Sequence, residues 1–439
     1  MNTAVIDGNK FMETVEKTDP IRRTGRVMEI IGLIIESKGP GVSVGDACSI
    51  ECLGENGPVQ AEVVGFRGER VLLMPLGEIS GVAPGASVSA SGRPLRVPVG
   101  HELLGRVLDG LGNPIDGLGS TGAKKTRPLV QKPPNPLTRR RIASPLATGI
   151  RSIDALLTCG KGQRVGIFSG SGVGKSVLLG MIARSCEADL NVIALIGERG
   201  REVRDFIEKD LGPEGLRKSV VVAVTSDQAA LIRLKGALLA TAIAEHFRDL
   251  GLDVMLMMDS LTRVAMSQRE IGLAVGEPPT TKGYPPSVFA FLPRLLERSG
   301  TSSVGSITGL YTVLVEGDDM SEPVADAARS ILDGHIILSR KLAAENHYPA
   351  VDVLESVSRV MIDVVDGKQK KEAARVREVL AVYRESEDLI NIGAYVKGSN
   401  PRIDFALSKI DPIRGFLRQG IEERTGFDET VRRLGSLLN

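Results

Sequence analysis

The sequence of 439 residues contains no tryptophan, only 3% aromatic residues and only four cysteines. So few aromatic residues argue against a surface that stacks the bases of single-stranded nucleic acid. A net charge of +1 argues against binding to nucleic acid or acidic lipid by bulk electrostatic attraction. The CxxxC pair of Cys48 and Cys52 has no second Cys/His pair to complete a zinc site, so we expect reduced thiols in a cytosolic protein. No apolar run approaches the roughly 18–20 residues of a membrane-spanning helix.

The composition, with 42% hydrophobic and 25% charged residues, is that of a globular protein of two or three domains. Residues 25–97 contain short runs of β-forming residues separated by glycine turns. The dipeptide Asn56-Gly57 predicts a hairpin turn between strands at 49–53 and 59–64. About six strands at this spacing predict a small closed β-barrel.

A basic, proline-rich stretch follows the predicted barrel. Residues 119–145 contain seven lysines and arginines, five prolines and no acidic residue. Because proline is excluded from helix interiors and central strands, we expect a solvated connector that lies along the next domain. A nucleic-acid-binding patch is the alternative interpretation.

In the next part of the chain, continuous apolar runs alternate with helical patterns, including Val177–Cys186 and Ala229–Phe247. Continuous runs are typical of strands buried on both faces, so the alternation predicts a mainly parallel sheet covered by helices. The runs are Val165–Phe168, Val192–Ile196, Val220–Val224, Val254–Met258 and Gly309–Val315. From Asp366 onward the pattern is helical, with breaks at Gly393 and Gly398–Pro401, and predicts a small helical C-terminal domain.

The most specific motif follows the first of these apolar runs and opens a helical pattern. It consists of Ser169, Gly170, Ser171, Gly172, Val173, Gly174, Lys175 and Ser176. In a phosphate loop the glycines let backbone N–H groups turn toward phosphate oxygens, and the helix N-terminus adds a positive dipole. Lys175 is expected to reach the β- and γ-phosphates, and the Ser176 hydroxyl to bind Mg²⁺. Ser169 replaces the first glycine of the strict pattern, a small change at the end of a strand.

Three further residues are candidates for the chemistry of a nucleoside triphosphate. Asp259 ends an apolar run in the manner of a Walker B strand, where a carboxylate can hold the Mg²⁺ shell. Glu198 follows the next predicted strand after the loop, and it either polarises the attacking water or only caps the following helix. Arg359 either neutralises charge on the γ-phosphate, from the same chain or from a neighbour, or forms a structural ion pair.

With these motifs, nearly the whole chain resembles the P-loop ATPases of rotary-ATP-synthase type. It resembles most the flagellum-specific branch of the type III protein-export ATPases. The phrases that carry the resemblance are residues 166–176, 196–203, 267–279, 283–289, 315–324 and 348–352. The resemblance implies an α/β fold with a RecA-like P-loop ATPase core, an N-terminal small β-barrel and a C-terminal helical domain.

The implied domains are a flexible N-terminal arm at 1–24, a β-barrel at 25–97, a RecA-like nucleotide-binding ATPase domain at 98–365 and a helical domain at 366–439. The resemblance also implies that the arm docks a regulatory export protein. The stretch 276–289 is implied to line the central pore of a ring, around a coiled-coil stalk protein.

The resemblance assigns roles to single residues. It makes Glu198 the catalytic carboxylate and places Arg199 and Arg263 near the γ-phosphate. It makes Arg359 an arginine finger that reaches the site of the next subunit. Tyr348 is implied to stack on the adenine ring. A looser alignment implies that Phe416 closes the other side of that pocket.

These roles imply Mg²⁺-dependent ATP hydrolysis at the subunit interfaces of a homohexamer that energises flagellar protein export. The implied partners are a membrane-embedded export gate, export substrates and their chaperones, with no nucleic acid. The implied location is the cytoplasm, peripheral to the inner face of the cell membrane.

Four alternatives remain open from the residues. The ATPase of a virulence-type injectisome is close, because only small differences in residues 261–266 and 283–286 favour the flagellar system. The catalytic subunit of a rotary ATP synthase has a longer tail with an acidic lever. A non-hydrolysing scaffold subunit lacks the carboxylate found here at Glu198. An RNA-translocating hexamer needs an aromatic, basic barrel, whereas residues 25–97 hold one aromatic residue, Phe66.

Overall fold

The structure is a computed structural model that describes residues 12, 23–53, 57–315, 317 and 319–438. Its internal contacts divide the chain into two compact units. The smaller unit is residues 1–95 with Ala274–Gly276, and the larger is residues 96–273 with 277–439. Most of the arm predicted at 1–24 lies outside the described residues, and the limits given to the four domains stay predictions.

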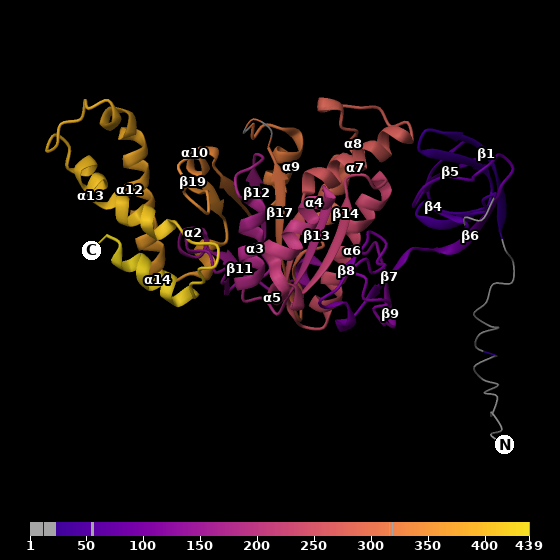
Figure 1. Cartoon of the computed structure of the whole chain (residues 1–439), viewed down its shortest axis with the longest axis horizontal. Coiled ribbons are helices and arrows are strands. Elements are labelled where there is room, and N and C mark those ends of the chain that lie inside the picture. Colours follow the sequence, from indigo (N-terminus) through magenta and orange to yellow (C-terminus); the bar gives the residue numbers. More distant parts are fainter. Residues whose placement is uncertain (1–11, 13–22, 54–56, 316, 318, 439) are drawn as a thin grey trace, which may run out of the picture. The chain divides into compact units, whose positions relative to one another are not determined.

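The smaller unit contains the predicted β-barrel (Figure 1). Six strands close it in the order β1-β2-β5-β4-β3-β6. They are β1 Thr24–Ile31, β2 Ile34–Lys38, β3 Asp46–Ile50, β4 Val59–Arg67, β5 Arg70–Pro75 and β6 Ser87–Pro94. Strands β3 and β4 pair antiparallel, with Ile50 opposite Val59, which confirms the predicted pairing of two successive strands. Strand β3 ends at Ile50 and not at residue 53, and Asn56 of the predicted turn lies outside the described residues. Inward-facing aliphatic residues such as Ile35, Val63 and Leu73 are fully buried and form a core separate from that of the larger unit.

The larger unit is built on one sheet with the order β19-β18-β12-β17-β15-β13-β14-β8. The strands along this path are parallel except β19, which runs antiparallel to β18. Its strands are β8 Val107–Leu108, β12 Arg164–Ser169, β13 Leu190–Glu198, β14 Ser219–Thr225, β15 Asp253–Asp259, β17 Ser306–Leu314, β18 Gly334–Leu338 and β19 Val351–Ser358, with the short β16 Gly300–Thr301 beside β17. The five predicted apolar runs are therefore β12, β13, β14, β15 and β17.

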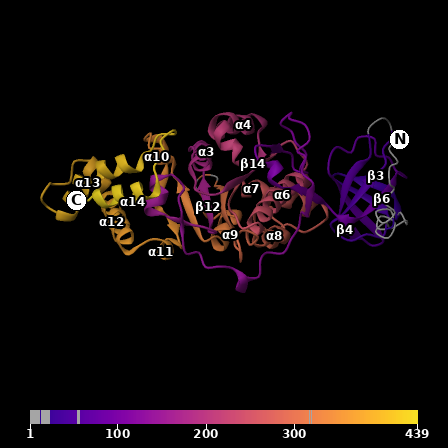
Figure 2. The ribbon, with the colours of Figure 1, turned by 90° about the horizontal axis from the view of Figure 1, so that it is seen from below.

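Helices cover both faces of this sheet. Figure 2 shows α3 and α4 on one side of the strands and α8 and α9 on the other. The helices of this layer are α3 Lys175–Ser185, α4 Gly200–Asp205, α5 Gly212–Arg217, α6 Ala230–Asp249, α7 Leu261–Ala274, α8 Pro286–Leu296, α9 Pro323–Ile331 and α10 Arg340–Ala344, with a π-helical turn, η3, at Phe206–Leu211 and a 3₁₀ turn, η4, at Thr281–Gly283. Helix α6 is almost entirely buried and packs on β13, β14 and β15.

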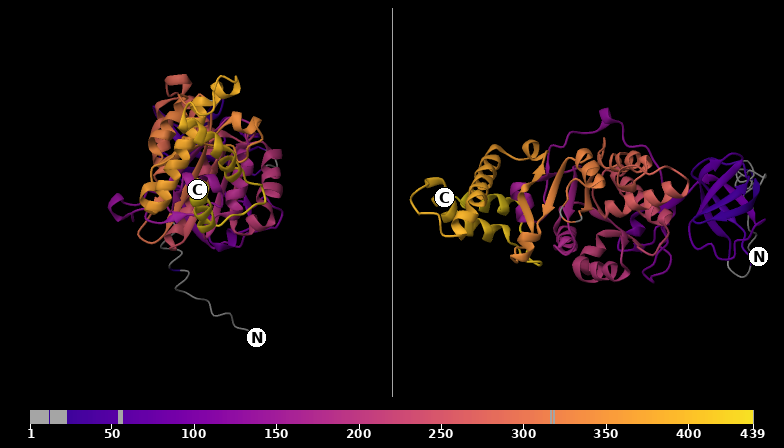
Figure 3. Two further views of the ribbon diagram at one scale, coloured as in Figure 1. Left: turned by 90° about the vertical axis from the view of Figure 1, so that its left-hand side faces the viewer. Right: turned by 90° about the horizontal axis from the view of Figure 1, so that it is seen from above.

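The last part of the chain is helical, as predicted, and packs beside the β19 end of the sheet (Figure 3). Its helices are α11 Met361–Val364, α12 Gly367–Asn391, α13 Pro401–Leu417 and α14 Phe427–Ser436. The buried Arg151, on α2 (Arg151–Leu156), joins this part to the sheet: its guanidinium donates to the carbonyl of Phe416 at 2.8 Å and pairs with Glu423. No helix that the structure describes is both long and apolar enough to span a lipid bilayer.

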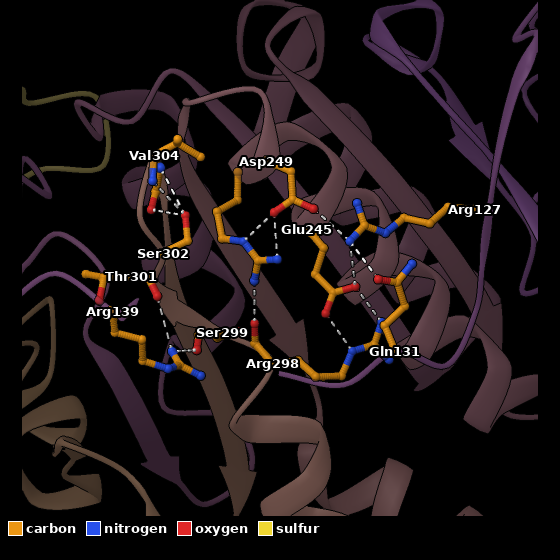
Figure 4. Close-up of polar contacts among 12 residues, drawn as sticks. Arg127, Gln131, Arg139, Glu245, Asp249, Arg298, Ser299, Thr301, Ser302 and Val304 are labelled. Atoms are coloured by element: carbon orange, nitrogen blue, oxygen red, sulfur yellow. Dashed lines mark hydrogen bonds and ion pairs between the residues drawn. The ribbon is translucent and has the colours of Figure 1, made fainter. Parts of the chain in front are cut away.

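The basic connector lies along the larger unit, as expected, but its arginines are not merely solvated. Strand β9 (Lys125–Pro128) pairs antiparallel with β7 (Arg96–Val99). Figure 4 shows Arg139 donating to backbone carbonyls near Ser299 and Thr301, at 2.8 Å and 3.4 Å. Arg140 donates to the carbonyl of Val304 at 3.0 Å. These carbonyls bind two of the seven basic side chains, which favours a structural role for this part of the connector.

An ion pair is buried between α6 and the segment that follows α8. The carboxylate of Glu245 accepts two hydrogen bonds from the guanidinium of Arg298, at 2.9 Å and 2.8 Å (Figure 4). The side chains of Arg298 and Glu245 are only 3% and 1% exposed. The guanidinium of Arg127 lies 3.8 Å from the same carboxylate. Because Arg127 pairs more closely with Asp249, at 2.8 Å, Arg298 is the arginine that depends on this buried carboxylate.

We expect the change Glu245→Gln to lower the free energy of unfolding by about 3–5 kcal/mol, because the Arg298 charge stays buried without its partner. Urea denaturation followed by far-UV circular dichroism measures this change. The control is Glu378→Gln, which removes the carboxylate of an exposed pair with Arg402 and should cost less than about 1 kcal/mol. Equal effects of the two changes would contradict the prediction.

Candidate functional site

The predicted phosphate loop connects the carboxyl end of β12 to the first turn of α3. Gly172 and Gly174 have φ of 79° and 85°, a left-handed conformation that side chains rarely adopt. Gly174 is the residue before the helix, so the free N–H groups of the first turn face the loop. Ser176 is exposed beside this loop. The backbone forms the cradle that oxyanions prefer at a helix N-terminus.

Two strand ends bring carboxylates to Lys175, and a third strand orients one of them. Its ammonium lies 2.5 Å from Oδ1 of Asp259, at the end of β15, and 3.8 Å from Oε1 of Glu198, at the end of β13. The hydroxyl of Thr312, on β17, donates to the same Asp259 oxygen at 2.6 Å. Because carboxyl ends of parallel strands meet at one edge of a sheet, residues far apart in sequence converge here.

The two carboxylates are largely buried, with side chains 14% exposed at Glu198 and 5% at Asp259. Burial, together with repulsion from Asp259, raises the pKa of Glu198 to about 7, although Lys175 acts in the opposite direction. One ammonium therefore serves two acids, which favours binding of a further cation. Carboxylate and hydroxyl oxygens are the ligands that Mg²⁺ prefers, so Asp259 and Ser176 fit a magnesium ion.

Arg263 and Arg199 occupy different environments. Arg263 packs against Gly197, where a Cβ would lie 3.0 Å from the arginine Cβ. Its buried Nε has no hydrogen-bond partner among the described residues, and it lines a cavity of about 580 Å³ beside Ser169 and Gly170. Arg199 is 82% exposed and lies 3.8 Å from Glu202. The structure thus brings Arg263, but not Arg199, beside the loop.

A second cavity, of about 540 Å³, lies on the α3 side of the loop. Tyr348 lines it, and a Cβ on Gly174 would lie 3.2 Å from Cε1 of this ring. Residues 418–421 also line it, and the N–H of Gln419 donates to the carbonyl of Tyr348 at 2.9 Å. The ring of Phe416 does not line this cavity: the residue is only 3% exposed, and the guanidinium of Arg433 lies 5.8 Å from the ring. The segment that follows Phe416, and not Phe416 itself, lines this cavity, and the roles given to these residues at adenine stay predictions.

Arg359 lies far from the loop of its own chain. In β12 and β18 the last residues, Ser169 and Leu338, are level with each other. In β19, Ser358 is opposite Gly334 at the start of β18. Along β18, Gly334 and Leu338 are four residues apart, which corresponds to about 13 Å. Arg359, the residue after Ser358, therefore lies at the edge of the sheet opposite the phosphate loop. It is exposed, and its guanidinium has no hydrogen bond or ion pair with any residue that the structure describes.

Thr312 was missed by the sequence reasoning. The signal was a polar residue inside the continuous apolar run of β17, which needs a partner when it is buried. Its hydroxyl fixes the orientation of the Asp259 carboxylate.

Three family models match the chain. They are the ATP synthase alpha/beta family nucleotide-binding domain over residues 149–358, the ATP synthase alpha/beta family beta-barrel domain over residues 27–92 and the T3SS EscN ATPase C-terminal domain over residues 365–436. The relatives include the "Flagellum-specific ATP synthase" of Bacillus subtilis, 57% identical, with 97% of this chain and 98% of that protein covered. The "Type 3 secretion system ATPase" of Xanthomonas euvesicatoria is 52% identical, with 95% of each covered.

Solved structures agree with these matches. The assembled ATPase EscN of the type III secretion system of enteropathogenic E. coli has a TM-score of 0.90 and 45% identity, with 94% of this chain and all of that chain covered. EscN in complex with its central stalk EscO has a TM-score of 0.88 and 44% identity, with the same coverage.

The protein belongs to the ATP synthase alpha/beta family, whose members bind nucleotide on a phosphate loop. Within this family it is an ATP-hydrolysing enzyme of the flagellum-specific and type III secretion group. The predicted fold class and enzyme class are confirmed. The roles assigned to single residues stay predictions.

We expect the change Tyr348→Ala to weaken ATP binding by roughly 5- to 100-fold, since stacking on a base contributes about 1–3 kcal/mol. Equilibrium titration with a fluorescent ATP analogue measures the Kd. The control Tyr348→Phe keeps the ring and should bind within about threefold of the original protein. Unchanged binding by the alanine variant would mean that the adenine lies elsewhere.

Proposed function

We propose that the protein hydrolyses ATP at the interfaces of a homohexamer and thereby energises protein export by the flagellar type III apparatus. The observation that supports an interfacial site is the position of Arg359, exposed at the edge of the sheet opposite Lys175. One chain carries the loop and the arginine on two different edges. A ring of identical subunits lets each arginine complete the site of a neighbour.

In this proposal the chain positions ATP and water and stabilises the charge that develops on the γ-phosphate. The backbone N–H groups of the loop and the Lys175 ammonium bind the phosphates. When the phosphates enter, Lys175 turns from Asp259 toward them. Asp259 and Ser176 would hold Mg²⁺, which would supply positive charge next to the phosphates. Glu198 orients the attacking water and accepts its proton.

The remaining site residues bind the adenine ring or neutralise charge on the phosphates. Tyr348 stacks on adenine, with residues 418–421 in the place that the alignment gave to Phe416. Arg263 binds a γ-phosphate oxygen through the guanidinium whose Nε is unpartnered. Arg199 and the neighbour's copy of Arg359 approach from the interface side and offset transition-state charge.

The proposed partners follow from the relatives. EscN is described as assembled and as bound to a central stalk, EscO. By analogy we expect a coiled-coil stalk protein in the pore lined by residues 276–289. We further expect a regulatory export protein on the arm at 1–24, and an export gate that receives substrates and chaperones. We therefore expect the ring to lie in the cytoplasm at the inner face of the membrane.

A virulence-type injectisome is the second candidate system. The C-terminal residues 365–436 match a model built on an injectisome ATPase, and the Xanthomonas euvesicatoria relative is almost as similar as the flagellar ones. Deletion of the gene separates the two systems: loss of flagellar filaments supports the first, and intact motility with loss of effector secretion supports the second.

We expect the change Lys175→Ala to lower ATP turnover at least 100-fold, because the phosphates lose the ammonium that the loop provides. A phosphate-release assay measures the turnover. The control is Lys161→Ala, which removes a lysine paired with Asp253 at the other end of the strands and should keep most of the activity. Unchanged turnover in the Lys175 variant would refute the phosphate-loop assignment.

We expect chains with Glu198→Gln and chains with Arg359→Ala each to be inactive alone but partly active when mixed. In a randomly mixed ring about a quarter of the interfaces combine an intact Glu198 with an intact Arg359. The measurement is ATPase activity after co-assembly from denaturant or co-expression. Mixed rings without any recovery would show that the arginine does not act on a neighbouring subunit.

A further inference from the structure

The connection between β18 and β19 touches the phosphate loop at both of its ends. This segment, Ser339–Ala350, is closed at its base by the N–H of Ser339, which donates to the carbonyl of Ala350 at 2.8 Å. Tyr348 meets the loop at Gly174. Arg340, at the start of the same segment, meets it at Gly170.

The contact at Gly170 is unusually close. A Cβ on this glycine would lie 2.5 Å from Nη2, 2.7 Å from Nε and 3.0 Å from Cζ of Arg340. The guanidinium therefore lies against the glycine Cα, in the space that any other residue would fill. A Cβ on Gly172, in the next turn of the loop, would meet nothing within 4 Å.

Backbone conformation does not explain this glycine. Gly172 and Gly174 have positive φ and need glycine for that reason, whereas Gly170 is not in the left-handed region. Its backbone accepts alanine, and the obstacle to a side chain is the guanidinium of Arg340. The residue at 170 is thus matched to the residue at 340.

Arg340 is held in place from two sides. The strand before it, β18, pairs with β12, which leads directly into the loop. The next residue, Lys341, forms an ion pair with Glu387 of α12. Arg340 therefore belongs to a framework anchored both to the sheet and to the C-terminal helices.

We propose that Arg340 is a positioning residue for ATP hydrolysis: its guanidinium supports the first turn of the phosphate loop by packing on Gly170. This inference rests on the phosphate-binding role proposed above for the loop. Because the turn has no side chain of its own to pack there, the arginine fixes where the following N–H groups point. Tyr348 secures the other end of the loop, so we expect loss of Arg340 to slow the chemical step more than it weakens ATP binding.

The test compares Arg340→Ala, Arg340→Lys, Gly170→Ala and the double variant Gly170→Ala/Arg340→Ala in the full-length protein. We expect Arg340→Ala to lower kcat about tenfold with KM changed less than about threefold. Arg340→Lys should recover part of kcat. Gly170→Ala alone should lower kcat to a similar extent, because its methyl group displaces the flexible guanidinium from the turn. In the double variant the methyl group fills part of the vacated space, and kcat should exceed that of either single variant.

The reference is Arg402→Ala, which removes an exposed arginine paired with Glu378 of α12 and should leave kcat within about twofold. Equal kcat in Arg340→Ala and the original protein would overturn the inference. So would a double variant whose loss is the product of the two single losses, because independent sites combine in that way. Thermal unfolding of each variant distinguishes lost positioning from lost folding. If kcat falls together with Tm and the double variant does not recover, the inference is also overturned. Lys175→Ala tests the loop itself, so failure there is distinguishable from failure here.

Discussion

The site depends on one ammonium group placed between two buried carboxylates. Lys175 begins α3, while Asp259 and Glu198 end β15 and β13, and only the parallel order of the strands brings the three together. Without the lysine, two acids would lie side by side in a poorly hydrated edge of the sheet. The single positive charge of the lysine does not balance both carboxylates. The site therefore suits a divalent cation that enters together with the phosphates.

Much of this could be predicted from the sequence, because local signals were strong. Continuous apolar runs identified the central strands, and Asn56-Gly57 identified a hairpin whose strands pair as expected. The phosphate loop was recognisable because glycine, lysine and serine stood between a strand and a helix. In each case the information lay within about ten consecutive residues.

What could not be predicted depends on contacts between distant segments. Nothing local shows that Arg340 fills the space over Gly170, since β18 must first lie beside β12. The hydroxyl of Thr312 reaches Asp259 only because β17 pairs with β15, and no local pattern in the sequence shows this pairing. An alignment with gaps assigned Phe416 to the adenine pocket, whereas its ring is buried in the core. The basic connector was read by composition, which does not reveal that Arg139 and Arg140 bind carbonyls.

The turn from parallel to antiparallel at β19 has a consequence for assembly. Strand β19 returns the chain to the edge of the sheet at which the parallel strands begin. Arg359 and the phosphate loop that a neighbour's Arg359 would complete therefore lie at opposite edges of the sheet in one protomer. A row of copies with two free ends then always contains one working centre fewer than it has members. Only contact between the last subunit and the first makes every ATP site complete. The rate of ATP hydrolysis would therefore rise by one step when the ring closes, and an open ring would leave incomplete sites on its two terminal subunits.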